Sequence, residues 1–392
     1  MTTELTRVAI VGAGPAGLLL SHLLAEAGID SIVVDNRSRA EIETTIRAGI
    51  LEQGTVEILT ETGVSDRVHT VGDKHAGIYL GFDGDLHHID FGELVGRNVW
   101  LYPQHEVLID LIAARLKAGQ DLRFGVTAER VEGAETDRPS IVTRDADGRE
   151  ITIEADVVVG ADGSRSVVRQ AVTGSHGGFF HEYPFAWFGI LAEASPSKDE
   201  LIYSNSPDGF ALISQRSPEV QRMYFQCDPS ADPNALSDAQ IWDELQRRTP
   251  GTDLNEGPIF QRDVLKFRSF VSHKMRAGRA VIVGDAAHTV PPTGAKGMNL
   301  AVADVVLLDR AIRSLLLKGD ETFFERFTED ALRRTWKAQQ FSWWMTSMLH
   351  QQPGASDFER HRQIAELRTV TDSEAGKRYL AEAYTGWPLL GR

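Results

Sequence analysis

A glycine-rich stretch near the N-terminus has the spacing of a dinucleotide-binding turn. Gly12, Gly14 and Gly17 follow a short β-rich run over residues 7–11 and precede an apolar helical run. The first glycine permits a tight turn, the second lets the backbone approach a pyrophosphate, and the third lets helix and strand pack closely. Asp35 ends the next predicted strand, where an acid takes a ribose hydroxyl. The spacing predicts a βαβ unit that binds a dinucleotide.

Two later turns, each at the end of an apolar run, add to this site. They are Asp162-Gly163, after residues 157–159, and Gly284-Asp285, after residues 280–283. Each turn alone is common at strand ends, but their joint order behind the N-terminal glycines favours FAD. A carboxylate at Asp285 can accept a hydrogen bond from a ribityl hydroxyl. The loop at 291–299 enters a helix and can present N–H groups to a flavin carbonyl.

A second group of polar residues lies on a predicted β-hairpin. Its strands are expected over 210–216 and 222–227. With a side-chain period of two, Ser214 and Arg216 share a face of one strand, as Arg222 and Tyr224 do on the other. If this face is interior, Arg216 needs a negative partner, because a buried unpaired charge is costly. Three interpretations stay open: a ligand carboxylate held bidentately, a structural salt bridge, or a solvated edge of the sheet.

The elements around these residues predict interleaved domains. Alternating segments at about 75–100 and 183–270 predict sheet, and the last quarter is mostly helical, at about 298–317 and 321–350. We expect a mixed α/β fold: a Rossmann-like FAD-binding domain with a parallel sheet, a sheet-rich substrate domain and a C-terminal helical region. The expected parts are FAD-binding 1–74, 101–182 and 271–317, substrate 75–100 and 183–270, and helical 318–392.

Composition excludes several classes of protein. The 392 residues are 42% hydrophobic and 25% charged, which is typical of a folded globular chain. The net charge of −15 disfavours nucleic-acid binding, which depends on neutralising phosphates. The single cysteine, Cys227, permits no intramolecular disulfide or thiolate zinc site, and we interpret it as a small apolar residue rather than a nucleophile. We expect no metal, no membrane span and a cytoplasmic location.

Four segments extend the pattern to nearly the whole chain. They are Ile46–Gly54, Phe210–Ser217, Pro291–Asn299 and Phe341–Ser347. With the glycine turns, they resemble the class A flavoprotein aromatic hydroxylases. The resemblance implies that FAD, reduced by NAD(P)H, forms a C4a-hydroperoxide with O2 and hydroxylates 4-hydroxybenzoate to 3,4-dihydroxybenzoate. It also implies a homodimer, to which the tryptophan-rich helix at 336–348 can contribute beside its core packing.

The resemblance assigns roles around the substrate. It places Ser214, Arg216 and Tyr224 on the benzoate carboxylate and the backbone carbonyl of Pro292 against the reacting ring, and it links Arg222 to movement of the flavin.

A proton relay is also implied by the resemblance. Tyr203 contacts the substrate 4-hydroxyl, Tyr384 passes the proton onward, and His75 releases it to solvent. The chemistry needs this because a phenolate is a much better nucleophile than a phenol, and hydrogen bonds to the charged form favour it. An imidazole suits the exit because it exchanges protons near neutral pH.

The cofactor contacts combine the glycine turns with the resemblance. The expected FAD residues are Gly12, Gly14, Gly17, Asp35, Arg47, Ala48, Gly49, Gln104, Asp162, Gly163, Asp285, Lys296, Gly297, Met298 and Asn299. No second fingerprint exists for the nicotinamide nucleotide, and the expected residues are Arg37, Glu41, Arg47, Arg165 and Arg268.

A departure from the family pattern concerns the electron donor. Members that use NADPH have arginine at the positions of Asn36 and Thr45, and tyrosine at Glu41. A carboxylate there repels a 2′-phosphate, which carries about −1.5 to −2 charges. We therefore predict use of NADH, alone or beside NADPH.

Three alternatives remain open from the sequence. A flavin reductase or oxidase would use the same FAD site without hydroxylation, although it would need neither Arg216 nor the relay. A ligand-binding flavoprotein would bind the aromatic acid without faster NAD(P)H oxidation. A related carboxylated phenol would keep the mechanism and change the ring.

Overall fold

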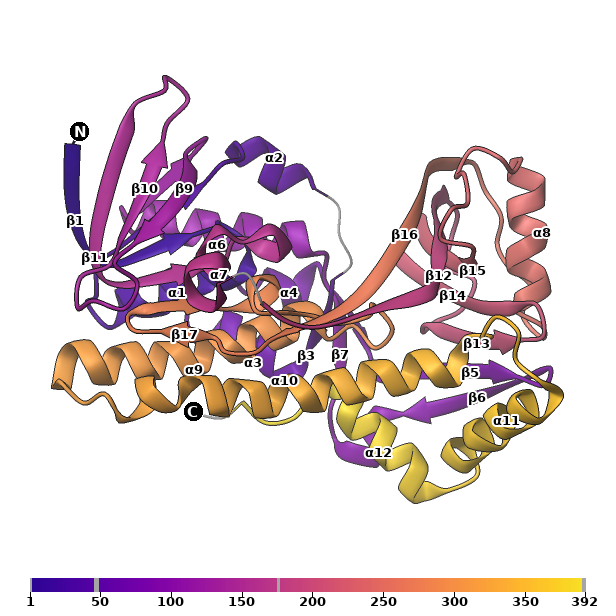
Figure 1. The fold of residues 1–392 in the computed structure, drawn as a ribbon. Helices are drawn as coiled ribbons and strands as arrows, with labels where there is room; N and C mark the ends of the chain where they lie inside the picture. The colour runs from indigo at the N-terminus through magenta and orange to yellow at the C-terminus, as the bar shows by residue number, and fades with distance from the viewer. Residues whose placement is uncertain (1, 46–48, 175–176, 390–392) are drawn as a thin grey trace.

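The computed structural model describes residues 2–45, 49–174 and 177–389. Two eight-stranded sheets and a small three-stranded sheet organise the chain. Figure 1 shows the first large sheet and its helices at one end and the second large sheet at the other, with the long helix α10 (Thr322–Leu349) running between them.

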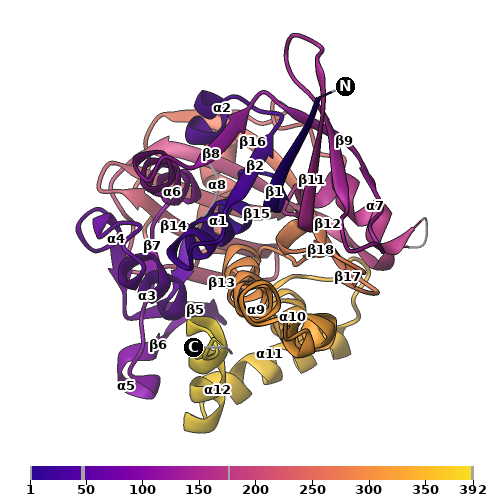
Figure 2. The same ribbon diagram turned by 90° about the vertical axis from the view of Figure 1, so that its left-hand side faces the viewer.

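The first sheet is the expected parallel unit. Its path is β17 (Arg276–Ala277), β18 (Ala280–Ile282), β11 (Glu150–Gly160), β1 (Thr2–Val11), β2 (Ser31–Asp35) and β8 (Asp121–Phe124). The neighbours β18–β11–β1–β2–β8 pair in parallel fashion. Strands β18 and β2 and the C-terminal parts of β1 and β11 are buried, as their continuous apolar runs predict. Helices α1 (Pro15–Glu26), α6 (Gln104–Lys117) and α9 (Gly297–Lys318) pack side by side on one face (Figure 2).

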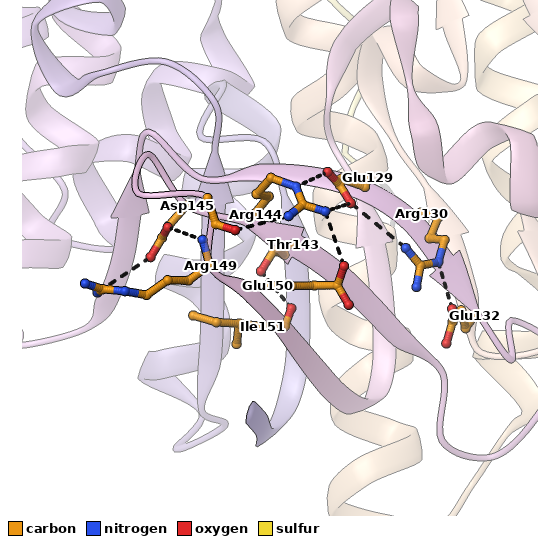
Figure 3. A network of polar contacts seen from close by, with 10 residues as sticks. Glu129, Arg130, Glu132, Thr143, Arg144, Asp145, Arg149, Glu150 and Ile151 are labelled. Atoms are coloured by element: carbon orange, nitrogen blue, oxygen red, sulfur yellow. Dashed lines mark hydrogen bonds and ion pairs between the residues drawn. The ribbon is translucent and has the colours of Figure 1, made fainter. Parts of the chain in front are cut away.

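Two strands extend the first sheet away from the hairpin of the expected substrate site. They are β9 (Thr127–Glu132) and β10 (Ser140–Arg144). Strand β10 pairs in antiparallel fashion with β11, and β9 pairs in antiparallel fashion with β10. Figure 3 shows the ion pairs that cover them: Arg144 binds Glu129 at 2.6 Å, and Arg130 binds Glu132 at 2.8 Å. These groups are exposed, so they add little to stability.

The second sheet is mainly antiparallel. Its order is β19 (His288–Thr289), β16 (Ile259–Ser272), β12 (Gly178–Glu193), β15 (Val220–Cys227), β14 (Gly209–Ser217), β13 (Ile202–Ser206), β5 (Gly77–Phe82) and β6 (Asp85–Asp90). The hairpin β14–β15 confirms the expected strands. Helix α8 (Asp238–Arg248) covers one face, where Phe188, Ile190 and Met223 pack. The opposite face packs against α10, α11 (Asp357–Thr371) and α12 (Glu374–Thr385).

Several short elements differ from the expected pattern. The sheet-rich segment at 183–270 contains α8, whose capping box between Ser237 and Gln240 is a local helix signal. The segment at 75–100 contains α5 (Phe91–Val95), capped by Asp90. The other elements are α2 (Arg39–Thr44), β3 (Ile50–Glu52), α3 (Gln53–Glu61), α4 (Arg67–Thr70), β4 (Asp73–His75), β7 (Val99–Leu101) and α7 (Val167–Thr173), with 3₁₀ turns at Gly163–Arg165 and Gly284–Ala286.

Among the described residues, no helix combines the length and apolar character that crossing a bilayer requires.

The single cysteine, Cys227, is half-buried, and burial raises the pKa of its thiol to about 11. A thiol held protonated is a poor nucleophile, in keeping with the interpretation of Cys227 as a small apolar residue.

Candidate active site

The three glycines of the N-terminal turn have distinct physical roles. Gly12 has a φ of +106°, and a Cβ there would lie 2.3 Å from the Ala161 carbonyl oxygen. A Cβ on Gly17 would lie 2.0 Å from the Gly12 carbonyl oxygen. Gly14 is different, because its nearest neighbour would be 3.9 Å away. The fold itself requires Gly12 and Gly17, whereas Gly14 leaves open space at the N-terminus of α1.

The Asp35 carboxylate is already engaged within the protein. Its oxygens accept the Ala13 N–H at 2.8 Å, the Arg37 N–H at 2.9 Å and two bonds from the Arg37 guanidinium. These contacts fix Asp35 beside the glycine turn, as expected. They also mean that Arg37 must move before a ribose hydroxyl reaches the carboxylate.

Four further expected FAD residues follow helix α2 in the chain. Arg47 and Ala48 lie outside the described residues. Gly49 is packed against the chain, since a Cβ there would be 2.0 Å from the Tyr102 carbonyl oxygen. Gln104 begins α6 and is partly exposed.

Asp162 has one oxygen without a partner. Its Oδ2 accepts the Val167 N–H at 2.7 Å, while Oδ1 is buried and has no hydrogen-bond partner in the described protein. Burial raises the pKa of this carboxyl. Gly163 follows with a φ of +74°, and Asp285 is exposed at the neighbouring strand end. A polar group of a cofactor would satisfy Asp162 Oδ1.

The loop before α9 is a tight turn. The Pro292 carbonyl accepts the Ala295 N–H at 3.0 Å, and Gly294 has a φ of +96°. Helix α9 begins at Gly297, with Met298 partly buried behind it, and has no side-chain cap. Its first backbone N–H groups therefore remain available for an acceptor.

The side chains of two expected flavin contacts, Lys296 and Asn299, also bond distant parts of the protein to one another. Lys296 Nζ is buried and binds Glu52 Oε1 at 2.5 Å and the Tyr384 carbonyl at 3.0 Å. The Asn299 amide makes four hydrogen bonds, among them Glu52 N–H and the Ile50 carbonyl at 2.9 Å each. Sequence reasoning missed Glu52, because an acid at the end of a short strand gives no signal of its distant partner.

The substrate hairpin presents its polar residues on one face of the second sheet. Tyr203 pairs with Leu212, and Leu212 pairs with Tyr224. Ser214 pairs with Arg222 in the next row of the same face. The period-two prediction is therefore confirmed for these residues, and a bulge at Arg216 interrupts the ladder between Gln215 and Ser217.

Positive charge gathers at the Arg216 end of this face. Burial, and then the neighbouring Arg222, lower the pKa of Arg216 to about 10. The Arg222 guanidinium lies 5.1 Å from the Tyr224 ring centroid and 3.4 Å from Asp263 Oδ2. Buried Nε atoms of both arginines, and Nη1 of Arg222, have no partner in the described chain. The cluster therefore has donors available for an anion.

Two tyrosine hydroxyls meet at the other end of the row. Tyr203 Oη and Tyr384 Oη are 2.7 Å apart, and both side chains are buried. Burial raises the pKa of Tyr203 to about 12 and holds that of Tyr384 well above its ordinary value. Both phenols are thus neutral hydrogen-bond donors and acceptors at neutral pH.

His75 does not bond Tyr384 directly. Within the described residues, His75 Nε2 contacts Gln215 Nε2 at 2.8 Å and Asp73 Oδ2 at 3.1 Å, while the buried Nδ1 has no partner. The Asp73 side chain is 59% exposed, so this cluster reaches solvent. Neither Gln215 nor Asp73 was predicted from the sequence, because their contact with His75 depends on the packing of two strands, β14 and β4.

Of the expected nicotinamide residues, Arg47 lies outside the described residues, and the other four are partly or fully exposed. Glu41 is exposed and closes a capping box with Ser38, whose side chain and N–H hold the pKa of Glu41 below its ordinary value. Its nearest expected partner, Arg37, is paired with Asp35. Arg165 and Arg268 are exposed, and Arg268 lies over the Phe180 ring.

The residues present fit FAD. Gly14 leaves room at the N-terminus of α1, Asp162 offers a buried acceptor without a partner, and α9 offers uncapped N–H groups. These features are an acceptor for a hydroxyl or ring N–H and donors for a pyrophosphate or a ring carbonyl.

Comparison with known proteins gives the same assignment. A sequence model of the FAD-binding domain matches residues 5–342. The p-hydroxybenzoate hydroxylase of Acinetobacter baylyi is 40% identical over 393 residues, covering 99% of this chain and 97% of that protein.

Solved structures share the fold. The p-nitrophenol 4-monooxygenase of Pseudomonas putida superposes with a TM-score of 0.82 at 20% identity, covering 98% of this chain and 99% of that one. Aklavinone-11 hydroxylase, solved with FAD and aklavinone, gives 0.72 at 22% identity over 89% of this chain and 70% of that one. Together with the sequence relationships, these findings show that the chain belongs to the FAD-binding family and is a flavoprotein aromatic monooxygenase.

Proposed function

We propose that this monooxygenase hydroxylates 4-hydroxybenzoate to 3,4-dihydroxybenzoate, with O2 and NADH as co-substrates. The observation that carries the proposal is the row on the second sheet, which has the Tyr203 hydroxyl at one end and the arginine cluster beside Tyr224 at the other. Tyr203 and Tyr224 are two strand spacings apart, about 10 Å along the sheet. A ring with a carboxylate and a hydroxyl at opposite ends matches this arrangement.

The side chains have separate tasks in this proposal. Arg216 binds the carboxylate, Ser214 and Tyr224 complete its surroundings, and Pro292 lies at the loop that faces the ring. Ser214 Oγ donates to the Arg222 carbonyl at 2.7 Å, so its lone pairs and position are fixed by the hairpin. Burial of the tyrosine pair excludes bulk water from the phenol end.

Proton movement follows the tyrosine pair. The substrate phenol donates toward Tyr203 Oη, and Tyr203 in turn donates to Tyr384 Oη across 2.7 Å. His75, bonded to Gln215 and Asp73, is the proposed exit toward solvent. FAD, when bound and reduced, would supply the electrophilic oxygen that the electron-rich ring of the substrate attacks.

The test is NADH oxidation by the FAD-loaded protein with and without 4-hydroxybenzoate, coupled to product analysis. We expect faster oxidation with substrate and stoichiometric 3,4-dihydroxybenzoate. Faster oxidation that yields only peroxide would show that this acid is an effector and that another ring is the substrate. Unchanged oxidation would favour a flavin reductase or a ligand-binding flavoprotein.

The proposed preference for NADH rests on the charge balance after β2. Arg37 is paired with Asp35 and Arg39 with Glu43, so nearby cations are neutralised while Glu41 faces solvent. Glu41→Gln removes the charge but keeps a capping-box residue. We expect it to raise kcat/KM for NADPH several-fold relative to NADH.

Comparing Glu41→Gln with Ser38→Ala separates the effect of the Glu41 charge from the effect of the helix cap. Ser38→Ala removes the cap and keeps the Glu41 charge, so its NADPH-to-NADH ratio should match the wild type. A wild-type enzyme that strongly prefers NADPH would contradict the proposal.

A homodimer in the cytoplasm completes the proposed assignment. Trp336 and Trp343 on α10 are 46% and 49% exposed, which supports a contact surface on this helix. Light scattering after size-exclusion chromatography should give twice the chain mass of 43.3 kDa.

A further inference from the structure

A glycine in the second sheet brings a carboxylate to the substrate face. Gly189 on β12 pairs with Tyr224 on one side and with Asp263 on the other. Directly opposed residues point to the same face, so Asp263 extends the row that contains Tyr203 and Tyr224. A Cβ on Gly189 would lie 2.3 Å from Asp263 Oδ1 and 2.8 Å from Tyr224 Cε1. The missing side chain therefore makes the space into which the carboxylate and the phenol ring lean.

The Asp263 carboxylate in this space lies beside Arg222, one of the two arginines of the cluster. Asp263 Oδ2 lies 3.4 Å from Arg222 Nη2, and Asp263 Oδ1 is buried without a partner in the described chain. Burial raises the pKa of the Asp263 carboxyl, and Arg222 opposes that rise. The Arg222 guanidinium is almost fully buried, with 9% of its side chain exposed, so it needs this counter-charge.

The net charge of the cluster determines how many carboxylates a bound ligand can carry. Arg216 and Arg222 contribute two positive charges and Asp263 one negative charge, which leaves one positive charge for a ligand. We propose that Asp263 is a specificity-determining residue: it holds Arg222 and restricts the site to aromatic acids with a single carboxylate. A second carboxylate on the ring would meet Asp263 rather than an available cation. This inference rests on the proposed binding of the substrate carboxylate at Arg216.

The test compares a monocarboxylate with a dicarboxylate in the FAD-loaded enzyme. Dissociation constants for 4-hydroxybenzoate and 4-hydroxyphthalate are measured from the change in flavin absorbance. Asp263→Asn keeps the shape and removes the charge. It should shift the ratio of the two constants toward the dicarboxylate by about threefold to tenfold, because the side chain is partly exposed and solvent screens its charge.

Matched variants isolate the charge from the fold. Asp263→Glu retains the charge and should keep the wild-type ratio, while Asp263→Ser is a second neutral variant that should repeat the shift. Asp243→Asn, on the exposed side of α8, changes the net charge equally and should leave the ratio unchanged.

The outcomes distinguish this inference from the proposed function. A wild-type ratio in both neutral variants, with 4-hydroxybenzoate still bound, would overturn the role of Asp263 alone. An equal shift in Asp243→Asn would do the same, because it would show a bulk charge effect. Failure of the wild type to bind either acid would overturn the proposed substrate and this inference together.

Discussion

At the scale of single residues, hydrogen-bond partners differ among the residues expected to bind ligands. Arg216 and Asp162 each keep a buried polar atom without a partner among the described residues, whereas the Lys296 and Asn299 side chains are bonded within the protein. Burying a polar group without a partner is costly, so a ligand that bonds Arg216 or Asp162 would offset that cost.

The Tyr203 hydroxyl should govern ionisation of the bound substrate. A hydrogen bond to a charged oxygen contributes about 1.5–3 kcal/mol. Tyr203→Phe should therefore raise the pKa of bound 4-hydroxybenzoate by about one to two units. Absorbance titration of the complex measures this, and hydroxylated product should fall with it. Tyr384→Phe keeps the first hydroxyl and should shift the phenol less; an unshifted phenol in Tyr203→Phe would contradict the relay.

His350 should make the fold sensitive to acid. The ring accepts the Trp187 Nε1–H at 2.6 Å, and burial lowers the pKa of His350 to about 3. Below the ordinary value of 6.5 the unfolded chain takes up a proton that the folded chain refuses, so stability is lost as the pH falls from 6.5 toward 3. At pH 5 the loss is about 2 kcal/mol.

Urea unfolding at pH 7 and pH 5 tests this. His350→Gln keeps an acceptor for Trp187 without a titrating ring, so it should lose about 2 kcal/mol less than the wild type over that interval. Equal losses in both proteins would show that His350 is not responsible.

At the scale of elements, glycines decide how closely backbone segments approach. Gly17 lets α1 pack on the turn after β1, and Gly189 lets β15 and β16 side chains meet across β12. Both positions are dictated by neighbours in the fold, while Gly14 faces open space.

Two alanine variants should divide the glycine turn into packing and ligand roles. Gly17→Ala places a Cβ 2.0 Å from a backbone oxygen, so we expect it to lower the free energy of unfolding. Overpacking of this kind costs about 3 kcal/mol. Gly14→Ala should fold normally but bind FAD more weakly. Urea unfolding and FAD titration measure the two effects, and equal loss of stability in both variants would refute this division.

At the scale of the whole molecule, one buried ion pair joins distant parts of the chain. Lys296 at the start of α9 binds Glu52 at the end of β3 and the Tyr384 carbonyl in α12. The tyrosine pair therefore depends on the loop that precedes α9. Gly386 passes so close that a Cβ there would lie 2.0 Å from Glu52 Oε2.

Removing one partner of this pair should destabilise the protein strongly. Glu52→Gln leaves the Lys296 ammonium buried without a counter-charge, and such losses cost about 3–5 kcal/mol. Urea unfolding measures the change. The double variant Glu52→Gln, Lys296→Met should recover part of it, since no unpaired charge remains; a double variant as unstable as the single one would contradict this account.

The sequence by itself determined the parallel FAD-binding unit and the hairpin that places Ser214, Arg222 and Tyr224 on one face, whereas Tyr203 and Tyr384 were named only through the family resemblance. The reason is local: the glycine spacing, the period of two at Ser214 and the long apolar runs each act over a few residues. The expected helices at about 298–317 and 321–350 are confirmed within one residue as α9 and α10. Helices α5 and α8 were missed although their caps are local signals.

Only the tertiary structure decided which polar groups are partners. Lys296 and Glu52 are separated by 244 residues, and Gln215 and His75 by 140. Asp263 reaches the substrate face only because Gly189 lies between it and Tyr224 in the sheet. Strand order and register bring these residues together, and neither is encoded in the spacing of any one segment.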